Sequence, residues 1–122
     1  MSGIVTVRED LGIVEIRTQG DISIQDMIQT RESVVGICQE HKIYKVLIYA
    51  LDWSSRPDTF QLFQFGREMS ESVILRKIKF AVLASKATAE DIQFIKTVAL
   101  NRNGADIQVF DSLDAALAWL NP

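Results

Sequence analysis

Residues 45–51 of the chain read KVLIYAL, and residues 80–84 read FAVLA. Both runs are almost continuously apolar, which is typical of strands buried on both faces of a parallel sheet covered by helices. A shorter run, IQVF at residues 107–110, fits a further strand of the same kind. Because helix-length segments separate these runs, we predict an open α/β sheet with right-handed crossovers and helices on both faces.

The chain opens with two segments that alternate apolar and polar residues, GIVTVRE and GIVEIRT. A period of two residues is that of half-buried strands. Asp10, Leu11 and Gly12 lie between the segments, and Gly12 can adopt the positive φ that a tight turn requires. These segments therefore predict an antiparallel hairpin in front of the parallel strands.

Four helices are predicted, spanning about residues 24–40, 57–75, 89–103 and 112–120. Each is preceded by a polar residue able to cap it, and three have the spacing of a capping box. The predicted caps are Ser23 with Asp26, Ser55 with Asp58 (or Asp58 with Gln61), Thr88 with Asp91, and Asp111 or Ser112; Gly104 is the predicted stop of the third helix. The elements read β-β-α-β-α-β-α-β-α, in a single domain over residues 1–122.

Composition limits the classes of partner. The chain has 122 residues, 48% of them hydrophobic, which suffices for one domain with a full core. Its net charge is −3, and its longest basic cluster is RKIK at residues 76–79. Binding to nucleic acid or to an anionic membrane requires a denser positive patch, so we expect neither.

Cys38 is the only cysteine and His41 the only histidine. The lone cysteine allows no internal disulfide, and the pair does not supply a clustered set of metal ligands. The first ten residues lack the pattern of a signal peptide, and no apolar run is long enough to span a bilayer. We expect a cytoplasmic protein without a metal, a cofactor or a transmembrane segment.

Three stretches carry a likeness to a known family: YKVLIYALDWSS, IKFAVLASKATAED and VFDSLDAALAWLNP. With the opening hairpin and four helices, they resemble the STAS fold of anti-sigma-factor antagonists. The likeness is closer to the SpoIIAA-like group of small bacterial proteins, also described as STAS/SEC14 or CRAL-TRIO-like. The resemblance covers nearly the whole chain and implies the mixed five-stranded sheet and a partner-binding role.

One departure concerns the phosphorylated serine of such antagonists. They carry an Asp-Ser-Ser-Gly-like motif after the third strand, whereas here Asp52 is followed by Trp53, Ser54 and Ser55, without a glycine. The resemblance therefore does not transfer the phosphorylation site. Capping of the next helix is the simpler interpretation of Ser55, although a phosphate on Ser54, Ser55 or Thr59 would be well placed at a helix N-terminus.

The carboxyl ends of parallel strands are where open α/β sheets bind ligands. Polar residues follow the strands here, and the helix after them is too apolar for a single buried stripe, since Phe60, Phe63 and Ile74 point away from its main face. The candidate partner or ligand surface is Asp52, Trp53, Ser54, Ser55, Arg56, Phe60, Phe63, Arg67, Ser85 and Lys86.

Catalysis is not indicated. His41 ends the first helix, roughly 15–20 Å from Ser54 and Ser55 at about 3.3 Å per strand residue, so a Ser–His–Asp triad is not expected. No nucleophile elbow or glycine-rich phosphate loop occurs. We predict no catalytic residues; a weak alternative is an enzyme that uses Asp52, Ser54 or Lys86.

Arg31 interrupts the apolar stripe of the first helix. We expect it to reach the edge of the sheet or to pair with Glu15 or Asp21, and a ligand carboxylate or phosphate is the less favoured alternative.

Two functional hypotheses follow. The first is a non-enzymatic protein-interaction or regulatory module, expected as a homodimer, whose contact surface is the second helix and the preceding loop. The alternative, which the SEC14-like resemblance implies, is a small carrier of an apolar or lipid-like ligand. That carrier would need a cavity lined by Trp53, Phe60, Phe63 and Phe65.

Overall fold

The computed structural model describes residues 3–55, 57–100 and 106–122. Its strands are β1 (Gly3–Arg8), β2 (Ile13–Asp21), β3 (Lys45–Ser55), β4 (Lys79–Ala84) and β5 (Asp106–Phe110). Its helices are α1 (Ile24–His41), α2 (Thr59–Glu71), α3 (Val73–Arg76), α4 (Lys86–Leu100) and α5 (Leu113–Leu120). The predicted stop at Gly104, and Arg56 of the candidate surface, lie outside the described residues.

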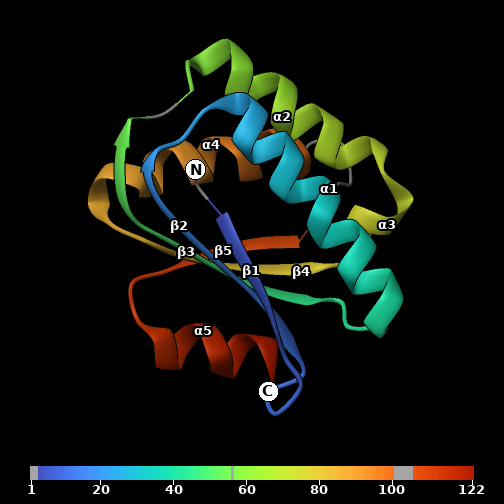
Figure 1. Cartoon of the computed structure of the whole chain (residues 1–122). Coiled ribbons are helices and arrows are strands. Elements are labelled where there is room, and N and C mark those ends of the chain that lie inside the picture. The colour runs from blue at the N-terminus through green and yellow to red at the C-terminus, as the bar shows by residue number, and fades with distance from the viewer. Residues whose placement is uncertain (1–2, 56, 101–105) are drawn as a thin grey trace.

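The five strands form one sheet in the order β1-β2-β3-β4-β5. β1 and β2 are antiparallel, and every later pair is parallel. Because successive right-handed connections run in one direction across the sheet, α1, α2 and α4 all cover the same face, while α5 covers the other (Figure 1). The predicted hairpin, mixed sheet and two covered faces are confirmed.

Strands β2 and β3 are longer than the predicted segments, and this lengthening is the main departure in the sheet. β3 pairs with β4 only as far as Ala50 and Ala84, yet β3 continues beside β2 to Ser55. Two register shifts interrupt the β2–β3 ladder near Gly20, whose φ is +79°. Such irregularities bend a pair of strands. Figure 1 shows the ends of these two strands, residues 18–21 of β2 and 52–55 of β3, rising from the sheet toward the start of α2. We call this pair of strand ends the β2–β3 ribbon.

The helix caps agree with the predictions at α1 and α5 and differ elsewhere. Ser23 and Asp26 form the capping box of α1, and Ser112 caps α5. The cap of α2 is Asp58, which exchanges hydrogen bonds with Gln61, so the alternative box is correct and the Ser55 cap is wrong. Ser55 cannot cap a helix because it still belongs to β3.

Two further helix predictions are corrected. The second predicted helix is divided at Ser72, whose backbone is extended and whose hydroxyl accepts a hydrogen bond from the N–H of Leu75. The third begins at Lys86, because Ser85 and Thr88 bond each other's backbone N–H in the manner of a capping box. Thr88 is thus inside α4, and its buried hydroxyl donates to the carbonyl of Ala50 at 2.7 Å.

The core has two parts, one on each side of the sheet. The larger part lies under α1, α2 and α4, where Cys38 is fully buried and burial raises the pKa of its thiol to about 11. The smaller part lies under α5, where Trp119 packs against Phe110 and beneath the ammonium group of Lys79. Within the described part of the chain, no helix is both long and apolar enough to cross a membrane.

Candidate functional site

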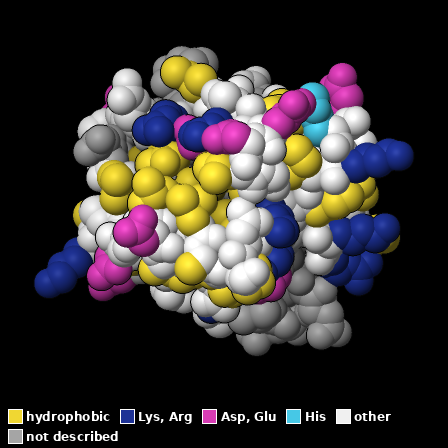
Figure 2. All heavy atoms as spheres, turned by 90° about the horizontal axis from the view of Figure 1, so that it is seen from below, with side chains coloured by type: hydrophobic (Ala, Val, Ile, Leu, Met, Phe, Trp, Pro, Cys, Tyr) yellow, Lys and Arg dark blue, Asp and Glu magenta, His cyan; other side chains and the backbone are white. Residues whose placement is uncertain are grey.

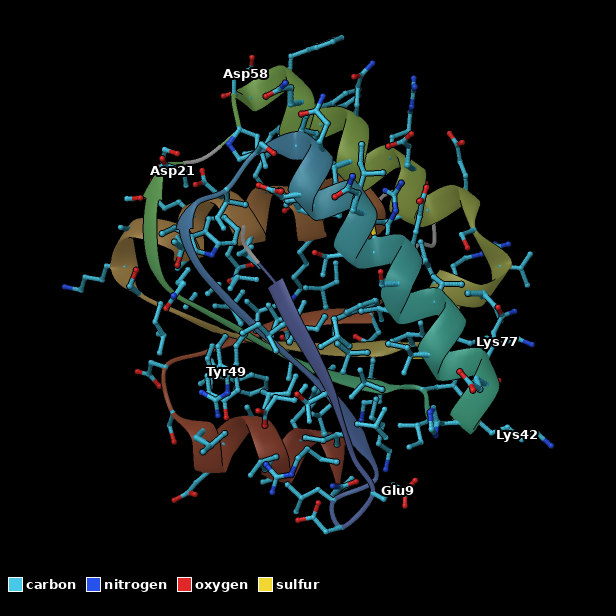
Figure 3. All side chains as sticks on the ribbon, in the orientation of Figure 1. Glu9, Asp21, Lys42, Tyr49, Asp58 and Lys77 are labelled. Atoms are coloured by element: carbon cyan, nitrogen blue, oxygen red, sulfur yellow. The ribbon has the colours of Figure 1, made fainter. Side chains whose placement is uncertain are left out.

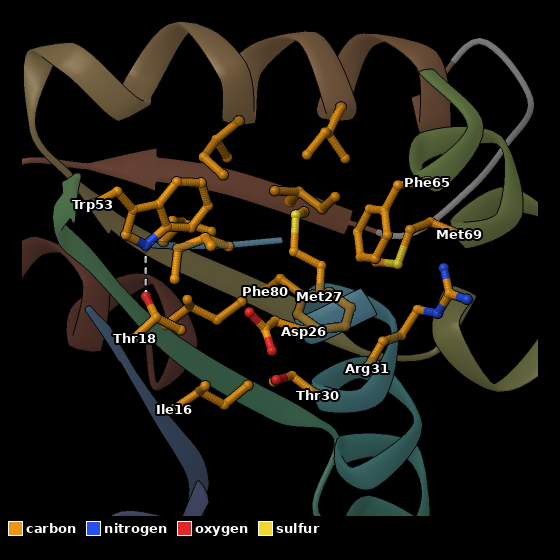
Figure 4. A pocket seen from close by; sticks show the side chains of 16 residues that line it. Ile16, Thr18, Asp26, Met27, Thr30, Arg31, Trp53, Phe65, Met69 and Phe80 are labelled. Atoms are coloured by element: carbon orange, nitrogen blue, oxygen red, sulfur yellow. Dashed lines mark hydrogen bonds between the residues drawn. The ribbon is translucent and has the colours of Figure 1, made fainter. Parts of the chain in front are cut away.

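A cavity of about 100 Å³ lies between the sheet and the layer formed by α1, α2 and α4 (Figure 4). Its walls are mainly apolar and include Ile16, Ile48 and Val82 from the sheet and Met27, Phe65 and Ile95 from the helices. We call this space the inner cavity. It lies beside the strands rather than beyond their carboxyl ends, because the parallel strands follow one another without the reversal in order that creates a crevice there.

The raised β2–β3 ribbon closes one end of the inner cavity. Trp53 lines it, and the indole Nε1 of Trp53 donates a 2.8 Å hydrogen bond to the hydroxyl oxygen of Thr18. That hydroxyl in turn donates to the carbonyl of Tyr49 at 2.6 Å. The polar edge of the indole is therefore satisfied on the ribbon, and its apolar rings are available to the cavity.

Of the four aromatic residues expected to line a ligand cavity, two do so. Trp53 and Phe65 are in the wall. Phe60 is 66% exposed, and Phe63 is half-buried on the outer side of α2. The difference follows from the helical period, because Phe65 is on the face shared with Leu62 and Met69, whereas Phe60 and Phe63 are turned away from it.

Arg31 lies between the inner cavity and the space outside it. Its side chain is 14% exposed, its guanidinium carbon is 4.8 Å from the ring centre of Phe65, and its Nη1 is 3.5 Å from Oε1 of Glu68. The predicted pairing of Arg31 with Glu15 or Asp21 is therefore wrong. Glu15 is bound by Arg8 and Arg17.

A second hollow, which we call the α1–α2 groove, has a volume of about 260 Å³. Its lining residues are Arg31, Glu32 and Val35 of α1, with Glu68, Ser72 and Leu75 of the facing segment. Arg31 lines both spaces, so its side chain separates the apolar interior from a groove that carries two carboxylates. The sequence shows Arg31 as a charged residue within an apolar stripe, but no local pattern reveals that its neighbours come from α2.

The serines that follow Trp53 have a structural role at the end of the β2–β3 ribbon, where β3 ends at Ser55 and β2 at Asp21. We call this end the ribbon tip. Ser54 and Ser55 are exposed, and their hydroxyls donate to Oδ1 of Asp21 at 2.9 and 3.0 Å. The hydrogen bond from Ser54, followed by that from Ser55, lowers the pKa of the Asp21 carboxyl. A phosphate on either serine would meet this carboxylate, which opposes phosphorylation by like-charge repulsion.

The predicted candidate surface is divided in the structure. Ser54 and Ser55 are beyond the last β3–β4 pair by four and five residues, which is roughly 13–16 Å of strand. Ser85 and Lys86 come directly after β4, so they are not at the ribbon tip. The backbone of Asp52 belongs to β3 and not to a loop, and its side chain lies outside the described residues.

Neither a metal centre nor a serine triad is assembled among the described residues. No group of three His, Cys, Asp or Glu side chains there could hold a metal ion. His41 is in the last turn of α1. Its neighbour Lys42 and Asp21, the partner of the serines, lie at opposite ends of the molecule (Figure 3).

Hydrophobic side chains also gather on the α5 side of the molecule (Figure 2). The most exposed large one of this helix is Leu113, at 41%. Ala116 and Leu120 of the same helix are fully buried against the sheet.

Comparison with known proteins agrees with this architecture. The family model described as SpoIIAA-like matches residues 13–121. The crystal structure of an anti-sigma factor antagonist from Mycobacterium paratuberculosis has a TM-score of 0.62 at 16% identity, over 99% of this chain and 94% of that chain.

An uncharacterized protein with a SpoIIAA-like fold from Shewanella loihica has a TM-score of 0.59 at 15% identity, over 98% and 92%. No curated protein matches the sequence. The two likenesses to solved structures establish the fold alone, whereas the family model covers most of the chain. The chain belongs to the SpoIIAA-like family.

Proposed function

We propose that the chain is a non-enzymatic regulatory module that acts by binding another protein. The observation that carries the proposal is the exposure of Phe60, 66% of whose surface is open to solvent in the first turn of α2. Exposed apolar patches rimmed by polar groups mark contact sites, and Phe60 has the half-buried Phe63 beside it at the i, i+3 spacing of one helix face. The likeness in fold to an anti-sigma factor antagonist supports the same class of function.

The proposed contact surface is the outer face of α2 with the ribbon tip beside it, and we call it the α2 surface. Phe60, Phe63 and Arg67 follow one another at helical spacing, and Arg67 is 3.7 Å from Glu71 one turn further on. Ser54 and Ser55 contribute exposed hydroxyls from the tip of β3. An aromatic anchor with a polar rim is the usual composition of a protein interface.

The test compares two charge insertions. Phe60→Glu places a charge in the α2 surface, and Leu113→Glu places one on α5, across the sheet. Sedimentation velocity of each purified variant reports self-association, and affinity capture from the source organism with quantitative mass spectrometry reports other partners. We expect a second copy or one identified protein to be bound by the wild type and by Leu113→Glu, and lost with Phe60→Glu. If Phe60→Glu and Leu113→Glu both bound the second copy or the protein partner equally well, the α2 surface would be excluded as the contact site.

The inner cavity favours a second candidate function, the carriage of a small apolar ligand. Preformed apolar spaces with a few polar groups at their margin are the usual form of ligand sites. Native mass spectrometry of the protein purified gently from its source tests this, since a retained small molecule adds a discrete mass. The Ile92→Phe variant, which adds volume to the cavity wall, should lose that mass.

A further inference from the structure

The environment of the Arg31 guanidinium is incomplete for a buried cation. Its Nη1 is buried and, among the described residues, has no hydrogen-bond partner. The distance from this Nη1 to Oε1 of Glu68 is 3.5 Å, which is longer than the 2.7–2.9 Å of a charge-assisted hydrogen bond, and the Glu68 side chain is 45% exposed. The ring of Phe65 contributes a cation–π contact but no acceptor for the N–H. A buried charged donor without an acceptor is costly, so this atom has unused capacity to bind an anion.

Arg31 also lies at the boundary between two spaces of opposite character. The inner cavity is almost wholly apolar, and the α1–α2 groove is polar. Neither space alone reaches the roughly 300 Å³ of a typical small-molecule site, but the two volumes together exceed it. A ligand that used both would need an apolar part on the inner side of Arg31 and a charged group at its guanidinium.

We propose that this site binds a small monocarboxylate, with its carboxylate on Arg31 and its apolar tail in the inner cavity. This inference rests on the second proposed function, the carriage of an apolar ligand, and names the chemical class. The planar guanidinium fork matches a carboxylate in bidentate geometry.

Surrounding charges select the carboxylate and its orientation. Glu32 and Glu68 line the groove, so a phosphate carrying close to two negative charges meets more repulsion there than a single carboxylate does. Asp26 is in the wall of the inner cavity, and its negative charge disfavours an anionic group inside. The carboxylate of the ligand is therefore expected at Arg31. Figure 4 shows Arg31 at the edge of the cavity near Phe65 and Met69, with Trp53 and Thr18 at the far end.

The size of the cavity limits the tail. An engineered apolar cavity of about 150 Å³ accommodates a benzene molecule. The inner cavity, at about 100 Å³, is smaller. The tail is therefore limited to a short chain of about five carbon atoms, and a long fatty acyl chain does not fit the space as it stands.

The experiment titrates the ¹⁵N-labelled full chain with hexanoate and with hexanamide, its uncharged counterpart of equal length. The indole N–H signals of Trp53 and Trp119 report the site, because Trp53 lines the cavity and Trp119 packs on the other side of the sheet. We expect the Trp53 signal alone to shift. Hexanoate should bind roughly tenfold or more tightly than hexanamide, the ratio expected for a charge-assisted hydrogen bond over a neutral one.

Three variants and a third probe complete the test. Arg31→Met keeps an apolar stem over Phe65 and should abolish the preference for hexanoate, whereas Arg76→Met, which removes an exposed charge from α3, should retain it. Ile92→Phe should lower the affinity for both hexanoate and hexanamide. Equal affinity for both probes in the wild type would overturn the anion site and leave the carrier function standing. Binding of neither probe would overturn both, and tighter binding of hexyl phosphate would overturn the choice of a carboxylate.

Discussion

The indole Nε1 of Trp53 and the hydroxyl oxygen of Thr18 are 2.8 Å apart, and their hydrogen bond joins the extended ends of β3 and β2. The same hydroxyl donates to the carbonyl of Tyr49. This short relay fixes the ribbon that closes the inner cavity, so a single hydroxyl connects the sheet to the candidate ligand site.

Replacing Thr18 by valine removes that hydroxyl while preserving the shape of the side chain. The N–H of Trp53 loses its acceptor and the carbonyl of Tyr49 loses a donor, so we expect the free energy of unfolding to fall by about 1–2 kcal/mol. Urea denaturation measures the loss. Thr97→Val is the matched control, since the exposed hydroxyl of Thr97 bonds only within α4, and it should change stability by no more than about 0.5 kcal/mol. Equal effects would contradict a special role for the relay.

A close approach between α2 and α4 predicts opposite outcomes for two glycines. A Cβ added to Gly66 would lie 3.0 Å from Cβ of Val98 and 3.1 Å from the carbonyl oxygen of Ile95, whereas one added to Gly36 of α1 meets nothing within 4 Å. Gly36→Ala should stabilise the protein by about 0.5–1 kcal/mol through helix propensity.

Gly66→Ala should instead destabilise by about 1 kcal/mol or more, because two helix backbones must separate to admit the methyl group. Thermal unfolding of the two alanine variants side by side gives the comparison. Stabilisation of both would mean that α2 and α4 are less closely packed than the structure shows.

The sequence was sufficient for those elements whose signals are local. The apolar runs at residues 45–51 and 80–84 fix the parallel strands, and the spacing of Ser23 and Asp26 fixes the start of α1. It was not sufficient for the β2–β3 ribbon. Apart from Trp53, residues 19–21 and 52–55 are polar or glycine, which normally indicates loops, and they form strands because each segment pairs with the other.

The inner cavity required information that no single segment contains. Trp53 and Phe65 were predicted to line a pocket and do so, but the direction of Phe65 follows from how α2 rests on α4, and that of Trp53 from its hydrogen bond to Thr18 on the neighbouring strand. Arg31 was conspicuous in its stripe, yet its neighbours Phe65 and Glu68 come from a helix more than thirty residues away. Tertiary packing, and not local propensity, decides these contacts.

The hydrogen bonds to Asp21 predict a specific titration. The hydroxyls of Ser54 and Ser55 lower its pKa, so the ionised form is favoured in the folded protein. Its contribution to stability is present above the unfolded pKa of about 3.8 and is lost as the pH falls through the lower folded value. In the Ser54→Ala/Ser55→Ala variant we expect the pKa to rise toward 3.8.

Carboxyl ¹³C NMR across the acid range measures this pKa directly. Asp26 is an internal control, because Ser23 lowers its pKa independently of the ribbon. A shift of both carboxyls in the variant would indicate a general change in the fold and not the loss of two hydrogen bonds.

Burial of Cys38 predicts a loss of stability in alkali. Its pKa is raised from 9.0 to about 11, so the folded state favours the neutral thiol. The contribution is fully present below pH 9 and is lost as the pH rises toward 11. Comparing urea midpoints of the wild type and Cys38→Ala between these limits isolates the thiol from other groups. Their difference should narrow with rising pH, and a constant difference would contradict the predicted linkage.

The end of α1 offers a site for stabilisation. Lys42 has φ 55° and ψ 40°, the left-handed conformation that costs a residue with a Cβ about 1 kcal/mol and costs glycine almost nothing. Lys42→Gly should therefore raise the free energy of unfolding by up to about 1 kcal/mol. Lys77, which follows α3, is exposed like Lys42 (Figure 3) but has φ −84°. Lys77→Gly should therefore lower stability by about 0.5–1 kcal/mol through backbone entropy. Chemical denaturation of the two variants distinguishes them, and destabilisation by both would show that the left-handed cap is not the limiting feature at Lys42.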